Sequence, residues 1–352
     1  MKPSETAIPD SMLASYLDGI ETITLRRVGV PVALDGQVLV RVEAVGVCGS
    51  DVHYFDHGRI GEYVADAPII LGHEAAGVVV GVGANVSRDR LGERVAVEPQ
   101  QPCRRCAHCK SGHYNLCSAI VFLATPPHDG AFTQYLRVDA DFAHTIPDAL
   151  SFEEAALCEP LSVAIWASRK AAIVAGSRVL ITGAGPIGLI TTQVARSFGA
   201  AEVIVSDPFQ SRRDAALYYG ATAVVDPASR DVAETADGVD VFIDASGSAR
   251  AISSGIHALA PLGRAVLVGS GTTAADVPIS RIQQRELQLT GVFRYANTWP
   301  LAIDMVARGV IDLASLVTAR FSLDEVDSAL RAGKQPVNVK SIVLPQRRTA
   351  RL

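Results

Sequence analysis

The sequence lacks the features that mark nucleic-acid-binding and membrane proteins. Its 352 residues carry a formal net charge of −5 and contain no long basic run, which argues against a nucleic-acid partner. The uncharged stretch 179–195 includes three glycines and a proline, and it is shorter than a membrane-spanning helix, which needs about 20 residues. Residues 1–10 lack the basic-then-apolar order of a secretory signal and are expected to form a short disordered tail. We therefore expect a cytoplasmic protein with no membrane or nucleic-acid partner.

The composition that remains is that of a globular enzyme. Hydrophobic residues make up 49% of the chain and charged residues 20%, which is ordinary for a soluble protein. The length predicts about two domains. Of the six cysteines, four lie within residues 103–117. In a chain without a secretory signal, such clustering favours metal binding over disulfide bonds.

Two hydrophobic patterns divide the chain. Apolar and polar residues alternate over about residues 18–45, and short glycine-punctuated segments such as 76–82 continue as far as residue 95. This period of two predicts a β-rich first domain. After about residue 161, buried strands alternate with helical stretches, of which the first is expected over 186–198. The strands of this second region are expected at 178–182, 202–207, 223–225, 241–244, 264–268 and 287–291.

Strands and helices that alternate at this spacing predict an α/β fold with a parallel, doubly wound Rossmann sheet. We expect a β-rich catalytic domain over residues 1–161 and a Rossmann domain over 162–296. The remaining residues, 297–352, are expected to return to the first domain.

A glycine-rich motif lies between the first buried strand and its helix, as Gly183-Ala184-Gly185-Pro186-Ile187-Gly188. Its glycines permit a tight turn, close approach of a pyrophosphate and close helix packing, and the helix N-terminus favours an anion. Asp207 ends the next strand, where a carboxylate accepts hydrogen bonds from ribose hydroxyls and repels a 2′-phosphate. The motif therefore predicts NAD as cofactor, although Arg212 and Arg213 weaken the preference over NADP because an arginine can meet a phosphate.

The four clustered cysteines have the spacing of a structural metal site. Cys103, Cys106, Cys109 and Cys117 can surround one tetrahedral zinc and leave no open position for a substrate. An iron–sulfur cluster is the competing interpretation, since cysteine spacing alone serves either group.

A second set of metal ligands is spread along the chain. Cys48, the pair His73-Glu74 and Glu159 offer thiolate, imidazole and carboxylate groups. Three such ligands and an exchangeable water form an open, catalytic zinc site. Each residue taken alone has an ordinary structural explanation, as a core cysteine, a turn histidine or a carboxylate at a helix start.

The segments that carry these ligands, Gly46–Asp51 and Gly72–Glu74, resemble the zinc-containing medium-chain dehydrogenases. Glu159, where many alcohol dehydrogenases have a second cysteine, resembles the sorbitol (polyol) dehydrogenase branch. The resemblance implies a GroES-like first domain and brings Cys48, His73 and Glu159 together at the catalytic zinc. It makes Glu74 an alternate ligand or a base beside the metal.

The resemblance also assigns a proton route and a polyol site. Ser50 and His53 occupy the family's relay positions, although Glu74 or a bound water is an alternative carrier in polyol enzymes. The segment 291–300 differs little from its counterpart in sorbitol dehydrogenases, whereas Phe55 stands where the animal enzymes commonly have tryptophan. The residues implied to line the substrate site are Tyr54, Ile60, Phe122, Thr125, Glu159, Arg294 and Tyr295. Those implied to contact the cofactor, besides the glycine motif and Asp207, are Arg212, Val268, Gly269, Ser270, Val292, Phe293 and Arg294.

The leading hypothesis is a zinc- and NAD-dependent polyol 2-dehydrogenase that converts sorbitol, L-iditol, xylitol or galactitol into a ketose. We expect it to form a homo-oligomer, either a tetramer or a dimer. The nearest alternative is a zinc dehydrogenase for secondary alcohols, diols or threonine. A non-catalytic dinucleotide-binding protein is the alternative of a different class, and retention of the zinc ligands argues against it.

Overall fold

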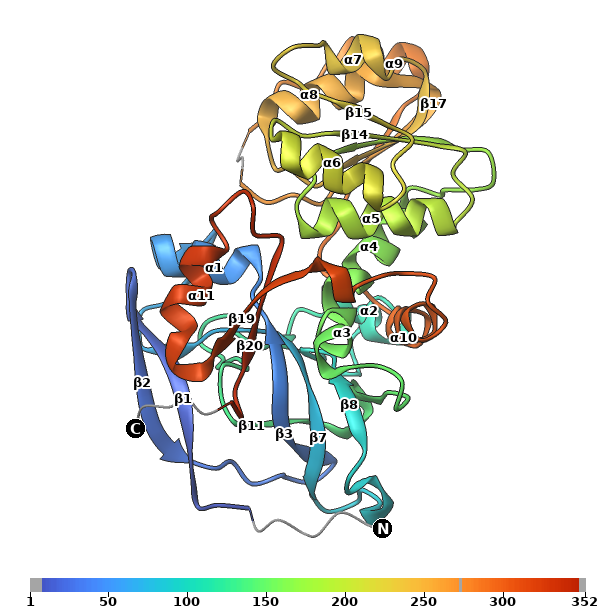
Figure 1. Cartoon of the computed structure of the whole chain (residues 1–352). Coiled ribbons are helices and arrows are strands. Elements are labelled where there is room, and N and C mark those ends of the chain that lie inside the picture. Colours follow the sequence, from blue (N-terminus) through green and yellow to red (C-terminus); the bar gives the residue numbers. More distant parts are fainter. Residues whose placement is uncertain (1–7, 272–273, 348–352) are drawn as a thin grey trace. The chain divides into compact units, whose positions relative to one another are not determined.

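The structure is a computed structural model that describes residues 8–271 and 274–347. The chain forms two compact units (Figure 1). Unit 1 contains the described residues of Met1–Glu159, Trp299–Ala307 and Leu313–Leu352, and unit 2 contains Pro160–Thr298 and Arg308–Asp312. The two main boundaries expected from the sequence lie two residues from these divisions, at 161 against 159 and at 296 against 298. Most of the expected disordered tail lies outside the described residues.

Unit 1 is built on antiparallel strands, as the alternating sequence predicts. Its largest sheet has seven strands, and its longest strand, β3 (Gln37–Gly46), is buried at most positions because β7, β11 and β20 all pair with it. The path through this sheet is β12 (Ala143–Thr145), β8 (Arg94–Val97), β7 (Glu74–Val82), β3, β20 (Lys340–Leu344) and β19 (Val317–Ser322), with β11 (Tyr135–Asp139) paired to β3. The only parallel pair described in it is β19 with β20.

A smaller sheet of three strands has the order β2 (Thr22–Gly29), β1 (Ser11–Gly19) and β6 (Ile69–Ile70). The expectation that strands begin near residue 18 was wrong. The first strand starts at Ser11, and its buried Met12, Ala14 and Leu17 face the core. Short strands complete the unit: β4 (Arg59–Ile60), β5 (Tyr63–Val64), β9 (Gln100–Gln101) and β10 (Val121–Phe122).

The helices of unit 1 are short, and side chains cap the start of some of them. Ser151 and Glu154 form a capping box at the start of α3 (Phe152–Ala156), which satisfies backbone N–H groups at that end. The others are α1 (Gly49–His57), α2 (Ala107–Lys110), α10 (Trp299–Ala307) and α11 (Val326–Ala332). Helices α1 and α11 lie side by side although far apart in sequence (Figure 1).

Unit 2 has a six-stranded parallel sheet, so the expected Rossmann fold is confirmed. Its strand order is β15-β14-β13-β16-β17-β18, which is the 3-2-1-4-5-6 order of dinucleotide-binding sheets. The strands are β13 (Arg178–Thr182), β14 (Glu202–Ser206), β15 (Ala223–Val225), β16 (Val239–Asp244), β17 (Leu259–Leu267) and β18 (Gln288–Gly291). The helices are α5 (Pro186–Ser197), α6 (Gln210–Tyr218), α7 (Val232–Thr235), α8 (Ala249–Ala258) and α9 (Ile279–Arg285); α4 (Cys158–Lys170) begins at the end of unit 1.

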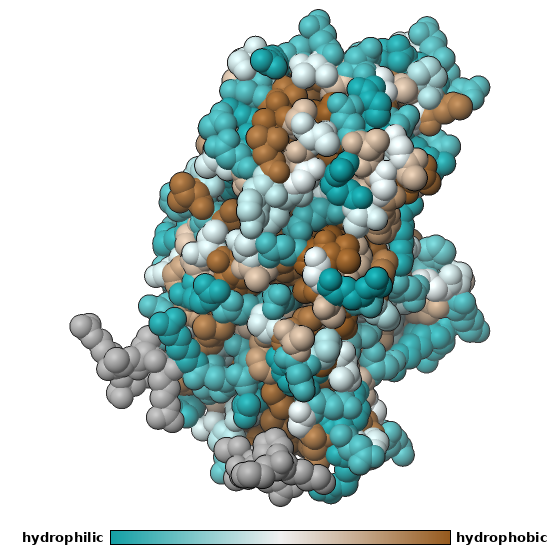
Figure 2. All heavy atoms as spheres, turned by 45° about the vertical axis from the view of Figure 1, so that its right-hand side comes forward, coloured by the Kyte–Doolittle hydropathy of each residue, from teal (hydrophilic) through white to brown (hydrophobic). Residues whose placement is uncertain are grey.

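Each unit buries its own apolar cluster, around Phe55 and Phe132 in unit 1 and around Phe242 in unit 2. Figure 2 shows the apolar residues of the face in view as separate brown groups among hydrophilic ones. In the described part of the chain, no helix has the length and apolarity needed to cross a bilayer.

Candidate metal centres and cofactor site

Three potential metal ligands meet in unit 1, where strands β3 and β7 pair. Cys48, His73 and Glu74 each offer one ligand atom, and these atoms all lie within 4.8 Å of one another. The strand register explains the convergence, because Gly46 at the end of β3 pairs with Glu74 at the start of β7. Cys48, two residues beyond Gly46, is therefore placed beside the His73-Glu74 pair.

The Glu74 carboxylate is held so that one of its oxygens has no hydrogen-bond partner. Its Oε2 is buried and unpaired among the described residues. It packs against Gly46, where a Cβ atom would lie only 1.9 Å from it, so glycine is required at that position. A buried, unpaired carboxylate oxygen is costly unless a cation meets it. Together with a thiol and an imidazole, this oxygen fits a zinc ion.

Asp51 joins the segments that carry Cys48 and His73, and its role was not predicted. Its Oδ2 accepts a hydrogen bond from the Cys48 N–H (2.9 Å), and its Oδ1 accepts one from the Gly72 N–H (2.9 Å). His73 Nδ1 lies 3.6 Å from the same Oδ1. A carboxylate beside a ligating imidazole fixes the ring's orientation. Burial alone lowers the pKa of His73, but the negative charges of Asp51 and Cys48 outweigh burial and raise this pKa well above its ordinary value.

Lys340 is the other unpredicted member of this centre. It lies on β20, is 3% exposed, and donates hydrogen bonds from Nζ to Glu74 Oε1 (2.6 Å) and to the Val47 carbonyl (2.8 Å). Burial lowers the pKa of Lys340, but the charges of Glu74 and Cys48, and then that of Glu159, raise it above its ordinary value. Lys340 is therefore a buried cation that compensates the carboxylates.

Glu159 lies near this group but outside it. It is 5% exposed at the start of α4, and its charge acts on Lys340. Among the described residues, the group whose ligand atoms lie within 4.8 Å of one another contains Glu74 and not Glu159. The set expected from the sequence, Cys48, His73 and Glu159, is thus brought together less closely than the set with Glu74.

The other residues of unit 1 expected near this centre lie on α1, β4 and β10, with Thr125 shortly after β10. Phe122 is buried, with its ring centroid 5.5 Å from that of His73. Tyr54 is buried on α1, whereas His53 is exposed and has its ring 4.6 Å from that of His57. Ser50 on α1, Ile60 on β4 and Thr125 are half-buried.

The four clustered cysteines also converge. Their sulfur atoms all lie within 4.8 Å of one another, with Cys106 Sγ and Cys109 Sγ 3.4 Å apart. Backbone N–H groups point at the sulfurs, as at Cys103, which accepts one from Cys106 (3.4 Å). Hydrogen bonds from the backbone N–H groups of Arg105 and Cys106 lower the pKa of the Cys103 thiol to about 6. A tetrahedral set of thiolates fits a structural zinc.

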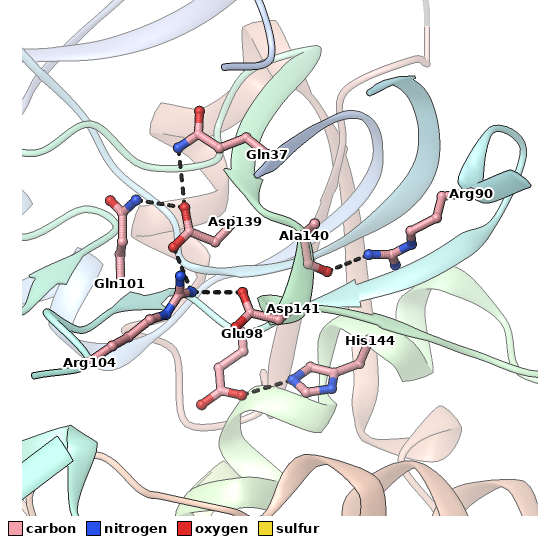
Figure 3. A network of polar contacts seen from close by, with 9 residues as sticks. All are labelled: Gln37, Arg90, Glu98, Gln101, Arg104, Asp139, Ala140, Asp141 and His144. Carbon is pink, nitrogen blue, oxygen red and sulfur yellow. Dashed lines mark hydrogen bonds and ion pairs between the residues drawn. The ribbon is translucent and has the colours of Figure 1, made fainter. Parts of the chain in front are cut away.

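Polar contacts attach this lobe to the sheet of unit 1 (Figure 3). Arg104 reaches between Asp139 (2.9 Å) and Asp141 (2.7 Å). Tyr114 donates to the buried Glu98 (2.8 Å), whose other oxygen contacts His144 Nε2 (2.8 Å). The lobe is therefore fixed by its own side chains as well as by any metal.

Unit 2 carries a cavity of about 550 Å³ at the carboxyl ends of β13, β14 and β16. Gly183 and Gly185 line it, and a Cβ atom at Gly188 would lie 1.8 Å from the Gly183 carbonyl oxygen, so the turn and the helix start pack as the motif predicts. Pro186 and Ile187 form the first turn of α5, at whose N-terminus free N–H groups favour a phosphate.

Asp207 lines the same cavity and is fixed by the backbone. Its Oδ2 accepts a hydrogen bond from the Ala184 N–H (2.8 Å) and its Oδ1 from the Phe209 N–H (2.9 Å). The two arginines that left the cofactor preference open have different positions. Arg213 is buried and donates to the carbonyls of Asp207 and Pro208, whereas Arg212 lines the cavity.

The segment after β18 contains strained backbone. Arg294 and Asn297 both have φ near 55°, in the left-handed region that non-glycine residues avoid. The Arg294 guanidinium lies 4.6 Å from the centroid of the Phe293 ring, and Arg169 donates to the Asn297 carbonyl (3.0 Å). Tyr295 is fully buried. Strain of this kind is concentrated at functional sites. The remaining residues of the expected cofactor site follow the ends of β17 and β18: Val268, Gly269, Ser270 and Val292.

Comparison with known proteins agrees with both parts of the fold. Residues 34–148 match the alcohol dehydrogenase GroES-like domain family, and residues 186–308 match the zinc-binding dehydrogenase family. A sorbitol dehydrogenase of Bacillus subtilis is 41% identical over 97% of this chain and 99% of its own. A probable D-xylulose reductase A of Aspergillus clavatus is 40% identical over 94% and 96%. The crystal structure of L-idonate 5-dehydrogenase from Escherichia coli superposes with a TM-score of 0.90 and 29% identity, covering 95% of this chain and 98% of that one.

The fold and the two ligand sets thus define a zinc-containing medium-chain dehydrogenase, an oxidoreductase with a nicotinamide cofactor. Within that family, the chain belongs to the sorbitol dehydrogenase branch.

Proposed function

We propose that this protein oxidises a secondary hydroxyl of a polyol to a ketone, with NAD as the hydride acceptor. The substrate carbon loses a hydride to the nicotinamide and its hydroxyl loses a proton, so polyol and NAD⁺ become ketose, NADH and H⁺. The observation that carries the proposal is the meeting of Cys48, His73 and Glu74, in a chain that is 41% identical to a sorbitol dehydrogenase.

Cys48, His73 and Glu74 Oε2 are proposed to hold the catalytic zinc. A zinc ion held there supplies Lewis acidity, which lowers the pKa of a coordinated hydroxyl. Lys340 holds the other oxygen of Glu74, and this favours binding of the metal through Oε2 alone. Glu159, buried near this group, is proposed to hold a water or the substrate hydroxyl.

The proton is proposed to leave through Ser50 and His53 on α1. Ser50 follows Cys48 by two residues, and the exposed imidazole of His53 can pass a proton to solvent. Glu74 does not fit this role well, because Lys340 pairs with it in the structure.

Recognition of the polyol is assigned to a small set of side chains that can donate or accept hydrogen bonds or supply apolar surface. Arg294 and Tyr295 are proposed to bond hydroxyls of the substrate, and Tyr54 others. Phe122 and Ile60 supply apolar surface, with Thr125 beside them. An unpaired buried hydroxyl costs about 1–3 kcal/mol, so a substrate rich in hydroxyls needs such partners.

NAD is proposed to lie along the cavity of unit 2 with its pyrophosphate at the glycine turn. Asp207 faces this cavity and would meet the adenosine ribose hydroxyls.

We also propose a cytoplasmic homo-oligomer, a tetramer or a dimer. Thiolates that serve as metal ligands are kept reduced in the cytosol, and edge strand β18 with its exposed Leu289 offers a surface for a second copy.

A substrate panel tests this function. The purified protein is assayed for NADH formation with sorbitol, xylitol, L-iditol and galactitol, and in parallel with 2-butanol, 2,3-butanediol and threonine. We expect the highest kcat/KM for one of the polyols. A higher kcat/KM for 2-butanol, the diol or threonine would replace this proposal with the alternative enzyme class.

A further inference from the structure

Asp244, the last residue of β16, is a buried carboxylate that the proposed reaction does not use. Its exposed fraction is 0%. Its side chain accepts four hydrogen bonds, and all its partners in the described chain are hydroxyl and backbone N–H groups. The donors are Thr182 Oγ1 (2.9 Å), Ser246 N (3.1 Å), Ser246 Oγ (2.6 Å) and Gly247 N (3.1 Å). Moving a carboxylate from water into the protein interior costs free energy, and here only neutral donors offset that cost. Packing of the sheet alone does not require a charged residue at this position.

These hydrogen bonds join neighbouring ends of the parallel sheet. Thr182 ends β13 directly beside Asp244 in the strand register, and Leu267 at the end of β17 is its neighbour on the other side. The Asp244 carbonyl accepts the N–H groups of Val268 and Gly269 (both 2.9 Å). One residue therefore binds, through side chain and backbone, the connections that follow β13, β16 and β17.

The same three connections pack backbone against backbone. A Cβ atom at Gly183 would lie 2.9 Å from the Ser246 nitrogen, and one at Gly269 would lie 2.2 Å from the Gly247 nitrogen. A Cβ atom at Gly247 would lie 2.3 Å from the Ser270 carbonyl oxygen. Because these backbone segments are packed so closely, a shift of the Ser246-Gly247 loop would displace both the phosphate-binding turn at Gly183 and the loop at Gly269.

Asp244 also sets the direction of a hydroxyl in the cofactor cavity. Ser246 lines this cavity and donates its proton to Asp244, while it accepts a hydrogen bond from the Ser248 N–H (3.1 Å). A serine oxygen has two lone pairs. The remaining lone pair of Ser246 is therefore available only as an acceptor for a donor group of the nucleotide.

We propose that Asp244 is the positioning residue of the dinucleotide site, which holds the loops after β13, β16 and β17 in the geometry that binds NAD. The inference rests on the proposed placement of the cofactor in this cavity. Asp244 touches no reacting atom, so its removal acts on cofactor affinity and not on the chemical step.

The test compares Asp244→Asn with Asp240→Asn in the full-length, zinc-loaded enzyme. Asparagine has the shape of aspartate but must turn its N–H₂ group either toward the Gly247 N–H or toward the donors of Thr182 and Ser246, so one oxygen acceptor is lost. Asp240 lies on the same strand at its opposite end, is exposed, and accepts the Arg178 N–H (2.8 Å). NADH dissociation constants are measured by fluorescence titration, with KM for NAD and kcat at saturating NAD. Asp207→Ala serves as a check on the location of the site.

For Asp244→Asn we expect the Kd for NADH and the KM for NAD to rise at least about tenfold, with kcat changed less than about twofold. For Asp240→Asn we expect no change in Kd, KM or kcat. If Asp244→Asn lowers the unfolding temperature while the folded protein keeps the wild-type Kd, Asp244 is only structural and the inference is wrong. If Asp207→Ala also leaves the Kd unchanged, the placement of the cofactor is wrong. Should Asp244→Asn fail to fold, Thr182→Val and Ser246→Ala each remove one donor, and an unchanged Kd in both overturns the inference.

Discussion

Removal of Lys340 should destabilise unit 1 strongly in the absence of zinc and weakly in its presence. Lys340→Met deletes the hydrogen bond to Glu74 Oε1 and leaves a carboxylate whose Oε2 is already buried and unpaired. Loss of one partner from a buried ion pair costs about 3–5 kcal/mol, which corresponds to a fall in unfolding temperature of roughly 6–20 °C for a domain of this size. Zinc restores a cation beside Glu74, so the stabilisation by zinc should be larger in the variant than in the wild type.

The assay follows unfolding of unit 1 through tryptophan fluorescence. The chain has two tryptophans, and Trp299 belongs to unit 1, whereas Trp166 belongs to unit 2, so a Trp166→Phe background isolates the signal. Unfolding is measured with zinc and after chelation, for Lys340→Met, Glu74→Gln and the double variant. Lys334→Met is the matched control, because Lys334 pairs with Asp56 and Glu21 at the surface, where ion pairs contribute little.

The double-mutant cycle decides the interpretation. If Lys340 and Glu74 compensate each other, the double variant should lose less stability than the sum of the single variants, by up to about 3 kcal/mol. Additive effects, or a Lys340→Met protein whose response to zinc equals that of the wild type, would refute the compensation argument.

Four further predictions concern the cofactor, the substrate, the zinc content and the reactivity of the thiols. Asp207→Ala should raise KM for NAD and improve relative use of NADP, because the carboxylate that faces the ribose is removed; wild-type kcat/KM values that are equal for both cofactors would show that Arg212 outweighs Asp207. Arg294→Ala should weaken transition-state binding of sorbitol by about 2–3 kcal/mol, which lowers kcat/KM for sorbitol, and should leave kcat/KM for 2-butanol and the zinc content unchanged. Equal losses of kcat/KM for both substrates would assign Arg294 to the fold or the cofactor. Cys106→Ser should lower the zinc content from two ions to one per chain. In chelated wild-type protein at pH 7, Cys103, with a pKa of about 6, should be alkylated rapidly. Cys158, whose thiol pKa burial raises to about 12, should not react; mass spectrometry of the labelled peptides would contradict this if the order were reversed.

Much of the fold could be predicted because its signals are local. The strand at 178–182 was predicted at its observed bounds, and the helix expected over 186–198 ends one residue earlier, at Ser197. Both follow from a short apolar run, a glycine turn and helical spacing. The start of β1 at Ser11 was missed because only partial alternation precedes the turn at Glu21.

The parts of the site that were missed depend on contacts between distant residues. Lys340 bonds Glu74, which is 266 residues away in the sequence, and no local pattern distinguishes this lysine from a surface lysine. In the sequence, Asp244 is indistinguishable from any polar residue at the end of a strand, because its four donors are identified only in the folded structure. Asp51 did have a local signal, since it is the third residue of α1 and bonds the Cys48 N–H as in a capping box. Glu159 was predicted by resemblance to be a ligand, but the structure places Glu74 in the tighter group.

Zinc held by Cys48, His73 and Glu74 is proposed to be required for oxidation of a polyol. The most direct measurement is NADH formation from sorbitol during stepwise return of zinc to chelated protein, for the wild type and for His73→Ala. We expect no activity without metal, and activity that rises with the zinc bound beyond the cysteine site in the wild type but not in the variant. Full activity of the metal-free protein, or of zinc-loaded His73→Ala, would show that zinc at this centre is not required.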